Sequence, residues 1–287
     1  FDIIYLLKIS DYSLIKKLGC LEHAKLVFHL SDAVWKPGYK GWGKVNKILK
    51  TADAIIVDNS YGAEYATQHN SFVYVNDAGV DLSRFVEVEQ QRKNEELVIG
   101  WIGSPSTQTA LLNIKKVLLG ILKNNSHVTY KFLGVEKTAF DFLPVGRCQT
   151  IGSYDEDALY KEIQTFDIGL FPKPFDDEDY CVRGPRKAML YMGCKKATVS
   201  TYGKSSFWRQ VEKYHAGYIA KTEEEWIIYL NKLLNDEELR REVGDNAFEF
   251  IKKKYTFEMC YLRLKESFES IISDTPKRKK TLWQNLF

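Results

Sequence analysis

The chain has 287 residues, of which 45% are hydrophobic, so it can bury a core of ordinary density in one large domain or two small ones. Its 41 lysines and arginines face 38 acidic residues, and the resulting net charge of +3 is too small for a protein that coats nucleic acid. The five cysteines are scattered and form no Cys-x-x-Cys pair, which argues against a disulfide framework or a thiolate zinc site. This composition favours a reducing, cytoplasmic setting.

The sequence contains no segment predicted to span a membrane, because no run approaches the roughly 18 to 20 uninterrupted apolar residues that a transmembrane helix needs. We therefore expect a soluble protein. Residues 1–7 (FDIIYLL) have the pattern of a buried strand, without an initiator methionine or a basic leader. This start predicts that the chain is cut from a longer parent.

Short apolar runs alternate with amphipathic stretches through the first part of the chain, a pattern typical of βαβ units around a parallel sheet. Ser60 can cap a helix that starts there. Residues 86–96 (VEVEQQRKNEE) are polar and charged, which is the composition of an exposed connector. The predicted strands are 2–7, 25–30, 54–57 and 72–75, and the predicted helices include 11–18 and 60–68.

After the connector the alternation resumes, and the apolar spacing of three and four residues over 223–273 predicts three further helices. The predicted strands here are 97–102, 128–133, 167–171 and 196–200, with helices at about 107–122, 155–164 and 185–192. The pattern predicts an α/β protein of two Rossmann-like domains whose parallel sheets face a cleft, since ligands of such sheets bind beyond the carboxyl ends of the strands. The expected parts are a domain at 1–80, a linker at 81–96, a domain at 97–255, and a last helix with a basic tail at 256–287.

The first candidate site is the run from Gly100 to Thr107 (GWIGSPST), in which a strand leads through a glycine turn into a helix. A helix start offers unpaired backbone amides, and Gly103 lets a phosphate approach the main chain. The run lacks the glycine order of dinucleotide folds and the Gly-Lys-Ser/Thr of phosphate loops, so it supports neither NAD binding nor ATP hydrolysis. An ordinary strand-to-helix turn with a serine cap explains the run equally well.

The second candidate site runs from Phe171 to Met192, where FPKP and the acidic loop FDDEDY precede CVRGPRKAMLYM. Pro185 suits the first turn of a helix, and Arg183, Arg186 and Lys187 gather at that helix start, where cations are poorly placed for helix stability. A departing nucleoside diphosphate would explain the cluster, because cations stabilise the negative charge that grows on the leaving oxygen. The alternative is a solvated basic face.

We expect no metal ion and no cofactor. The acidic loop at 176–179 has no calcium-loop spacing and no histidine partner, and the five histidines form no metal-binding pair. Only His29 stands out, at the carboxyl end of a predicted strand with Asp32 three residues on.

At these positions the sequence resembles the glycosyltransferase family 4 group, which has the two-domain GT-B fold. The run 151–160 (IGSYDEDALY) followed by 166–172 (FDIGLFP) resembles the family's glycine turn, short helix and strand ending in proline. The run from Asn59 to Phe85 resembles its domain-crossing connector with a Gly-Val-Asp turn, and the run 100–107 resembles its phosphate-facing loop.

The resemblance implies a retaining hexosyltransferase of glycan biosynthesis, which needs no metal and moves a sugar from a UDP- or GDP-linked donor to a glycan or lipid-linked acceptor. It also implies an amino-terminally incomplete first domain and a last helix, about 257–272, that crosses back onto that domain. By position it assigns Arg183, Lys187, His29 and Asp32 to catalysis, and Gly103, Ser104, Ser106, Gly152, Ser153, Arg186 and Leu190 to donor binding.

The sequence departs from the family pattern at two positions, which leaves other functions open. The family commonly has two glutamates eight residues apart that contact the donor sugar and the ribose, and the matching positions here are Val182 and Leu190. Their loss favours, as an alternative, a relative that binds nucleotide sugars or glycans without turnover. A sugar-nucleotide epimerase of the same fold is a third possibility.

The carboxyl-terminal residues 277–287 combine the basic run KRKK with Trp283, Leu286 and Phe287. Such a tail could rest on an anionic membrane at its inner, cytoplasmic face, where a lipid-linked acceptor lies. A disordered terminus is the alternative.

Overall fold

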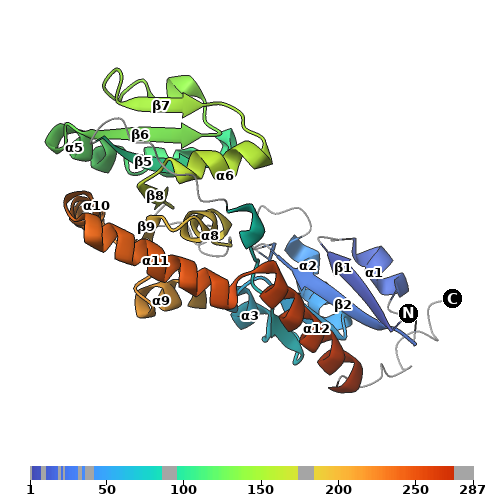
Figure 1. Ribbon diagram of the computed structural model, residues 1–287. Helices are drawn as coiled ribbons and strands as arrows, with labels where there is room; N and C mark the ends of the chain where they lie inside the picture. The colour runs from blue at the N-terminus through green and yellow to red at the C-terminus, as the bar shows by residue number, and fades with distance from the viewer. Residues whose placement is uncertain are drawn as a thin grey trace.

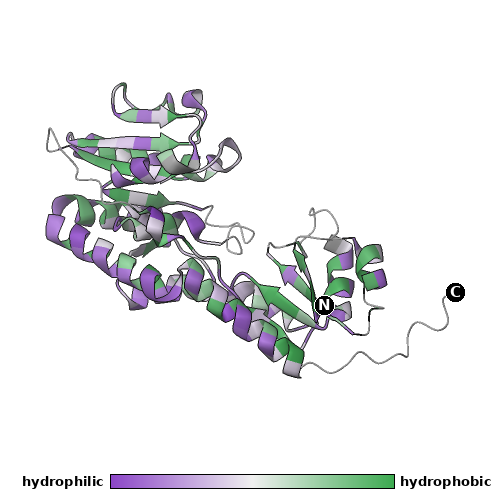
Figure 2. Ribbon diagram, turned by 45° about the vertical axis from the view of Figure 1, so that its right-hand side comes forward, coloured by the Kyte–Doolittle hydropathy of each residue, from purple (hydrophilic) through white to green (hydrophobic). Residues whose placement is uncertain are grey.

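The computed structural model describes residues 2–7, 11–18, 21, 23–31, 34–35, 42–85, 96–173 and 184–274. Within these ranges the chain forms a four-stranded sheet, a six-stranded sheet and a last helix that packs back against the first sheet (Figure 1). Figure 2 shows mostly hydrophobic strands in both sheets, between helices with hydrophilic outer segments.

The first sheet is entirely parallel, and its strands pair in chain order. The buried side chains of its two faces form separate clusters, one under three short helices and one under the last helix. Asn59, rather than the predicted Ser60, caps the third helix, because its side chain accepts a hydrogen bond from the Gly62 amide at 3.0 Å. The elements are β1 (Ile3–Leu7), α1 (Tyr12–Leu18), β2 (Lys25–Leu30), α2 (Trp42–Thr51), β3 (Ala54–Val57), α3 (Ser60–Ala66), β4 (Val73–Val75) and, on the opposite face, α12 (Phe257–Asp274).

The second sheet is also parallel, with the strand order β10-β9-β8-β5-β6-β7. Counted along the chain this is the 3-2-1-4-5-6 order of doubly wound folds, and the direction of winding switches between β5 and β8. The strands are β5 (Leu97–Ile102), β6 (Val128–Leu133), β7 (Cys148–Ile151), β8 (Ile168–Phe171), β9 (Ala197–Thr201) and β10 (Tyr218–Ala220).

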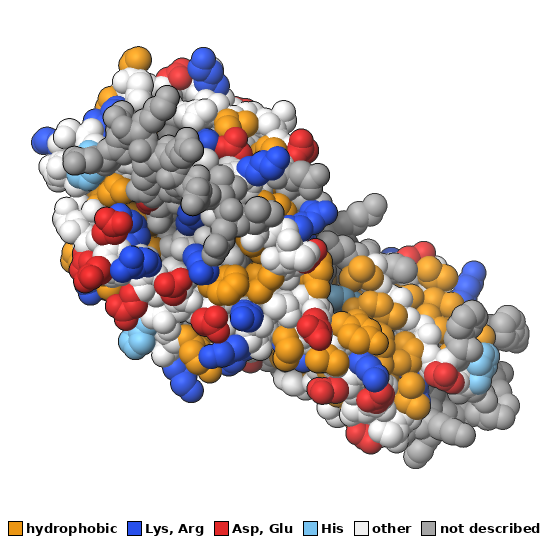
Figure 3. Space-filling view, in the orientation of Figure 1, with side chains coloured by type: hydrophobic (Ala, Val, Ile, Leu, Met, Phe, Trp, Pro, Cys, Tyr) orange, Lys and Arg blue, Asp and Glu red, His pale blue; other side chains and the backbone are white. Residues whose placement is uncertain are grey.

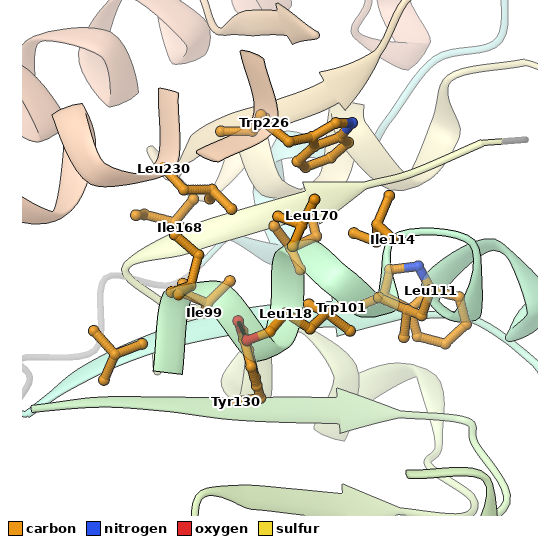
Figure 4. Packing of buried hydrophobic residues seen from close by; sticks show 14 of the residues in the cluster. Ile99, Trp101, Leu111, Ile114, Leu118, Tyr130, Ile168, Leu170, Trp226 and Leu230 are labelled. Carbon is orange, nitrogen blue, oxygen red and sulfur yellow. Dashed lines mark hydrogen bonds between the residues drawn. The ribbon is translucent and has the colours of Figure 1, made fainter. Parts of the chain in front are cut away.

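Helices cover both faces of the second sheet, which explains why its inner strands β5 and β8 are nearly continuous apolar runs. On one face, Trp226 and Leu230 of one helix and Leu118 of another pack on Ile99 and Leu170 (Figure 4). The helices of this face are α5 (Lys115–Asn124) and α10 (Glu223–Asn235), and the other face is covered by α6 (Glu156–Gln164), α8 (Arg186–Gly193), α9 (Ser206–Lys213) and α11 (Glu237–Lys254).

One predicted helix is wrong. In place of a continuous helix from about 107 to 122, the chain forms η2 (Pro105–Thr107), α4 (Thr109–Leu112) and α5. Gln108 separates η2 from α4, and Asn113 and Ile114 separate α4 from α5. The apolar spacing continues across the break because Leu111 and Ile114 both reach the core. The hydrophobic periodicity therefore continues across a point where the helix is interrupted.

The two sheets are held together by their connections. The Val80 amide donates to the Tyr255 carbonyl at 2.8 Å, and the Phe257 amide donates to the Val80 carbonyl at 3.1 Å, so the segment around Val80 lies beside the start of α12. The Ser206 amide at the start of α9 donates to Ser60 Oγ at the start of α3, at 2.8 Å. Because α3 follows β3 and α9 follows β9, this bond brings together segments that lie beyond the carboxyl ends of strands from both sheets.

The last helix leaves part of its surface apolar. Four of its large hydrophobic side chains are more than a third exposed, and Figure 3 shows hydrophobic side chains gathered over the half of the molecule that holds the first sheet and α12. These side chains are Phe257, Tyr261, Leu262 and Ile272. In the part of the chain that the structure describes, no helix is both long enough and apolar enough to cross a bilayer.

Candidate functional site

A cavity of about 410 Å³ opens beyond the carboxyl ends of β5 and β8, the two strands between which the winding of the second sheet reverses. In open α/β sheets this switch point is the usual place for a ligand, because the helices on either side diverge there. Described side chains from four segments line it: 101–110, 154–160, 171–173 and 184–190.

The loop after β5 forms one wall. Gly103 has no room for a side chain, since a Cβ there would lie 1.9 Å from the Trp101 ring. The Gly103 amide donates to the Leu133 carbonyl at 2.9 Å, and the Tyr154 hydroxyl donates to the Gly103 carbonyl at 2.9 Å, so the loop is fixed from two neighbouring segments. Ser104 follows, with its amide donating to Thr107 Oγ1 at 3.1 Å.

The start of α8 forms the facing wall. Lys187 Nζ donates to Thr107 Oγ1 at 3.0 Å and lies 4.6 Å from the centre of the Trp101 ring. Deeper in the core, the Ile102 amide donates to the Tyr191 hydroxyl at 2.8 Å. These contacts bring together two candidate segments that are about 80 residues apart in the chain, so both candidate sites of the sequence analysis border one cavity.

Lys173 is a residue of this cavity that the sequence analysis did not select. It follows β8, is only 2% exposed, and places its ammonium 5.1 Å from the centre of the Phe171 ring and 5.3 Å from that of Trp208. Its amide donates to Thr201 Oγ1 at 3.0 Å, which fixes the backbone at the cavity floor. The signal was present, because a lysine two residues after a buried strand of a parallel sheet stands at the ligand-binding edge.

The cavity has an uneven charge. Lys173, Arg186 and Lys187 line it, and none of its described lining residues is an aspartate or glutamate. Aromatic side chains supply much of the remaining surface, from Trp101, Tyr154, Tyr160 and Phe171. Three cations around one cavity favour an anionic ligand, and aromatic faces favour a ring stacked beside it.

The other predicted donor-binding residues lie in or beside this cavity. Leu190 lines it and is 6% exposed, as part of the apolar cluster between the sheet and α8. Ser106 Oγ lies 2.9 Å from Ser104 Oγ, next to the cavity wall. Gly152 and Ser153 are exposed and directly precede Tyr154, which does line it. Arg183 and Asp32 fall outside the described residues, as do the acidic loop 176–179 and the basic tail 277–287.

His29 lies elsewhere, on the first sheet. Its Nε2 is 2.6 Å from Asp58 Oδ1 and its Nδ1 is 2.5 Å from the Tyr5 hydroxyl. Burial is the main cause that raises the pKa of Tyr5 to about 12, and the charge of Asp58 adds to it. The Tyr5 hydroxyl therefore stays protonated and donates a hydrogen bond to Nδ1. Nε2 then carries the imidazole proton and donates to Asp58. With both ring nitrogens engaged, the imidazole holds its neighbours in place and has no nitrogen left for a substrate.

A polar cluster lies where the segment after β4 meets α12. Burial raises the pKa of Asp77 to about 6, the positive charge of Arg263 opposes this, and Asp58 adds to it. The Cys260 thiol donates to the Asp77 carbonyl at 3.1 Å, and Arg263 donates to Cys260 Sγ at 3.1 Å. Across the described ranges, no three histidine, cysteine or acidic side chains come together as a metal site would require.

Comparison with known proteins identifies the fold. No protein family model matches the chain, and no curated protein matches it in sequence.

Solved structures match nearly the whole chain in fold. The sucrose-phosphate synthase of Thermosynechococcus elongatus superimposes with a TM-score of 0.73 at 12% identity, covering 94% of this chain and 74% of that one. Anabaena HepE, solved with UDP and glucose, gives 0.71 at 14% identity, covering 94% and 78%. A glycosyltransferase from Rickettsia africae gives 0.71 at 13% identity, covering 95% and 77%.

The chain therefore has the GT-B fold, in which two Rossmann-like domains with parallel sheets face a cleft, as predicted. At these identities the similarity establishes the fold alone, and the chemistry has to be argued from the cavity.

Proposed function

We propose that the protein is a retaining glycosyltransferase of the family 4 type, which transfers a hexosyl group from a UDP- or GDP-sugar to a glycan or lipid-linked acceptor. The observation that carries the proposal is the convergence of Lys187 with the loop 103–107 on one cavity that is lined by cations. HepE, which shares the fold, was solved with UDP and glucose. No metal is assigned a role, since cations of the chain can take up the charge that a metal would neutralise.

In the proposed reaction the bond between the sugar and the diphosphate breaks while the diphosphate is held between the Gly103–Ser104 loop and α8. Lys187 would meet the leaving oxygen as negative charge develops there, and Arg183 and Arg186 would add to its stabilisation. The first-turn amides of α8 have no intrahelical acceptors and are suited to the same anion. The nucleobase would lie toward Gly152 and Ser153, where Tyr154 offers a ring.

The same cavity supports the alternative of a relative that binds without turnover. Leu190 occupies the position at which the resemblance implies a ribose-binding glutamate, and it is buried against apolar neighbours. A leucine accepts no hydrogen bond from a ribose hydroxyl, so binding of the nucleoside depends on other groups.

Two measurements separate these functions. Isothermal titration with UDP-glucose and GDP-mannose tests binding, and release of free UDP or GDP tests turnover, both with added EDTA to test independence from metals. Transfer predicts binding followed by nucleotide release that rises with a hydroxyl acceptor. Binding without release at any acceptor would support the alternative, release without any acceptor and with an epimerised sugar would support the epimerase, and absence of binding would exclude all three.

A further inference from the structure

A side pocket of about 160 Å³ adjoins the donor cavity. Tyr160, Arg186 and Leu190 line both spaces, so the side pocket and the donor cavity share a wall. Pockets that hold a whole ligand usually measure about 300 to 1,000 Å³, so the side pocket suits one part of a ligand that lies in the donor cavity. The other described residues that line it are Val80, Asp81, Arg84 and Phe257.

Asp81 provides the side pocket with a carboxylate. It caps the short helix η1 (Leu82–Arg84), because its Oδ1 accepts from the Ser83 hydroxyl at 2.6 Å and from the Ser83 amide at 3.0 Å. These hydrogen bonds hold the pKa of Asp81 below its usual value, so the side chain stays ionised. Both cap bonds use Oδ1, and Oδ2 lies 3.9 Å from Arg84 Nε, which is beyond hydrogen-bond distance. The side chain is 35% exposed, so a ligand hydroxyl can reach Oδ2.

Arg84 provides a donor beside this acceptor. Its guanidinium carbon lies 5.8 Å from the centre of the Tyr160 ring, and Phe85 packs edge-on against the same ring with the centroids 5.0 Å apart. These contacts hold η1 against α6. A guanidinium only donates hydrogen bonds and a carboxylate only accepts them, whereas a hydroxyl group does both. A pair of neighbouring hydroxyl groups therefore suits Asp81 and Arg84 together, and Asp81 would repel a further anion.

The ribose of the proposed donor would lie beside this pocket. Lys187, which the proposed function assigns to the diphosphate, precedes Leu190 by three residues on α8, a rise of about 4.5 Å along one side of the helix. Tyr154, whose ring is offered to the base, directly precedes α6, which carries Tyr160. A ribose that joins the diphosphate to the base would thus pass Leu190 and Tyr160. Leu190 accepts no hydrogen bond, so the ribose hydroxyl groups need partners from the side pocket.

We propose that Asp81 and Arg84 bind the 2′- and 3′-hydroxyl groups of the donor's ribose, so that the segment joining the two sheets recognises the nucleoside. This inference rests on the proposed transferase function and deepens it, because it assigns the residues that distinguish a ribonucleotide from its deoxy analogue.

The test measures the binding of UDP and of GDP by isothermal titration, each beside its 2′,3′-dideoxy analogue, which lacks both hydroxyl groups. The variants are Asp81→Ser, which can still cap η1 but withdraws the carboxylate, and Arg84→Met, which keeps an apolar stem over the Tyr160 ring without the guanidinium. Asp141→Ser, which alters an exposed aspartate between β6 and β7, is the control. Melting temperatures are measured for all of them.

We expect the wild type and the control to bind the ribonucleotide about tenfold or more tightly than its dideoxy analogue, the effect of a hydrogen bond to a charged group. In Asp81→Ser this ratio should fall to about twofold or less, with affinity for the dideoxy analogue unchanged. In Arg84→Met it should fall to an intermediate value.

A merely structural role for Asp81 predicts a different result, namely a lower melting temperature and equal losses of affinity for both nucleotides. Equal affinity of the wild type for a ribonucleotide and its dideoxy analogue would overturn the inference, and so would a ratio in Asp81→Ser equal to that of the control. Both results leave nucleotide binding, and with it the proposed function, intact. If the wild type bound neither UDP nor GDP, the proposed function itself would be refuted, so the two failures are distinguishable.

Discussion

The carboxyl edges of the two sheets differ in the chemistry they present. The edge of the six-stranded sheet gathers Lys173, Arg186 and Lys187 with no described carboxylate in its cavity, whereas the edge of the four-stranded sheet gathers Asp58, Asp77 and acceptor oxygens. The same βαβ architecture therefore carries cations at the carboxyl edge of one sheet and carboxylates at that of the other. The comparison teaches that sheet topology determines where a site lies, while the residues just beyond each strand determine what it binds.

The largest effect should follow from removing the cations at the carboxyl edge of the six-stranded sheet. Replacing Lys187 and Arg183 together by alanine should remove at least about 3 kcal/mol of transition-state stabilisation, as calculated from the fall in kcat/KM. This is the magnitude found when one preorganised hydrogen-bond donor to a developing charge is removed. Steady-state release of UDP from UDP-glucose measures it. Lys116→Ala, an exposed lysine on α5, is the matched control. Equal kcat/KM in the double variant and the control would remove the charge argument.

The next effect concerns two glycines at the carboxyl edge of the six-stranded sheet, which differ in the space around them. Gly103→Ala should destabilise the fold by about 2 to 3 kcal/mol, because its Cβ would overlap the buried Trp101 ring. Gly152→Ala should fold normally, since the nearest atom to its Cβ is 3.8 Å away. Urea unfolding measures both. If Gly152 faces the nucleobase, its variant loses affinity for UDP without loss of stability, and unchanged affinity would contradict that placement.

The acidic edge predicts a pH dependence of stability. Because the pKa of Asp77 is raised to about 6 by burial, the folded protein binds this proton more tightly than the unfolded chain, and stability falls as the pH rises from about 4 to about 6. Asp77→Asn should therefore be more stable than the wild type by about 2 kcal/mol at pH 8, after allowing for partial exposure, and no more stable at pH 4. Unfolding curves at both pH values measure it. A stabilisation equal at both would show that Asp77 is not the titrating group.

The smallest effect tests the contact between the two walls of the donor cavity. Thr107→Val keeps the shape of the side chain but removes the oxygen that accepts from Lys187 and from the Ser104 amide. We expect affinity for UDP to fall by about 1 kcal/mol, a typical net value for a hydrogen bond, because the ammonium and the loop at Ser104 each lose a fixed contact. Thr109→Val, on the neighbouring helix α4, serves as the control. A tighter complex in Thr107→Val would mean that Thr107 competes with the ligand for Lys187.

The sequence predicted most buried strands, because a strand covered on both faces is a continuous apolar run, as in Ala54–Val57 and Ile168–Phe171. It missed Cys148–Ile151 and Tyr218–Ala220, the edge strands of the second sheet, whose shortness and polar residues give a weak pattern. The GT-B fold was predicted from the order of motifs together with this alternation, and the structural comparison confirms it.

What the sequence determined alone was the alternation of elements and the presence of cations near the start of α8. Only the tertiary structure decided that Lys187 meets Thr107, that Lys173 is buried in the same cavity, and that both nitrogens of His29 are engaged by Tyr5 and Asp58. The physical reason is that apolar periodicity is a local property of the chain. Which side chains meet at a carboxyl edge depends instead on strand order and register, which bring together residues 24 to 80 positions apart.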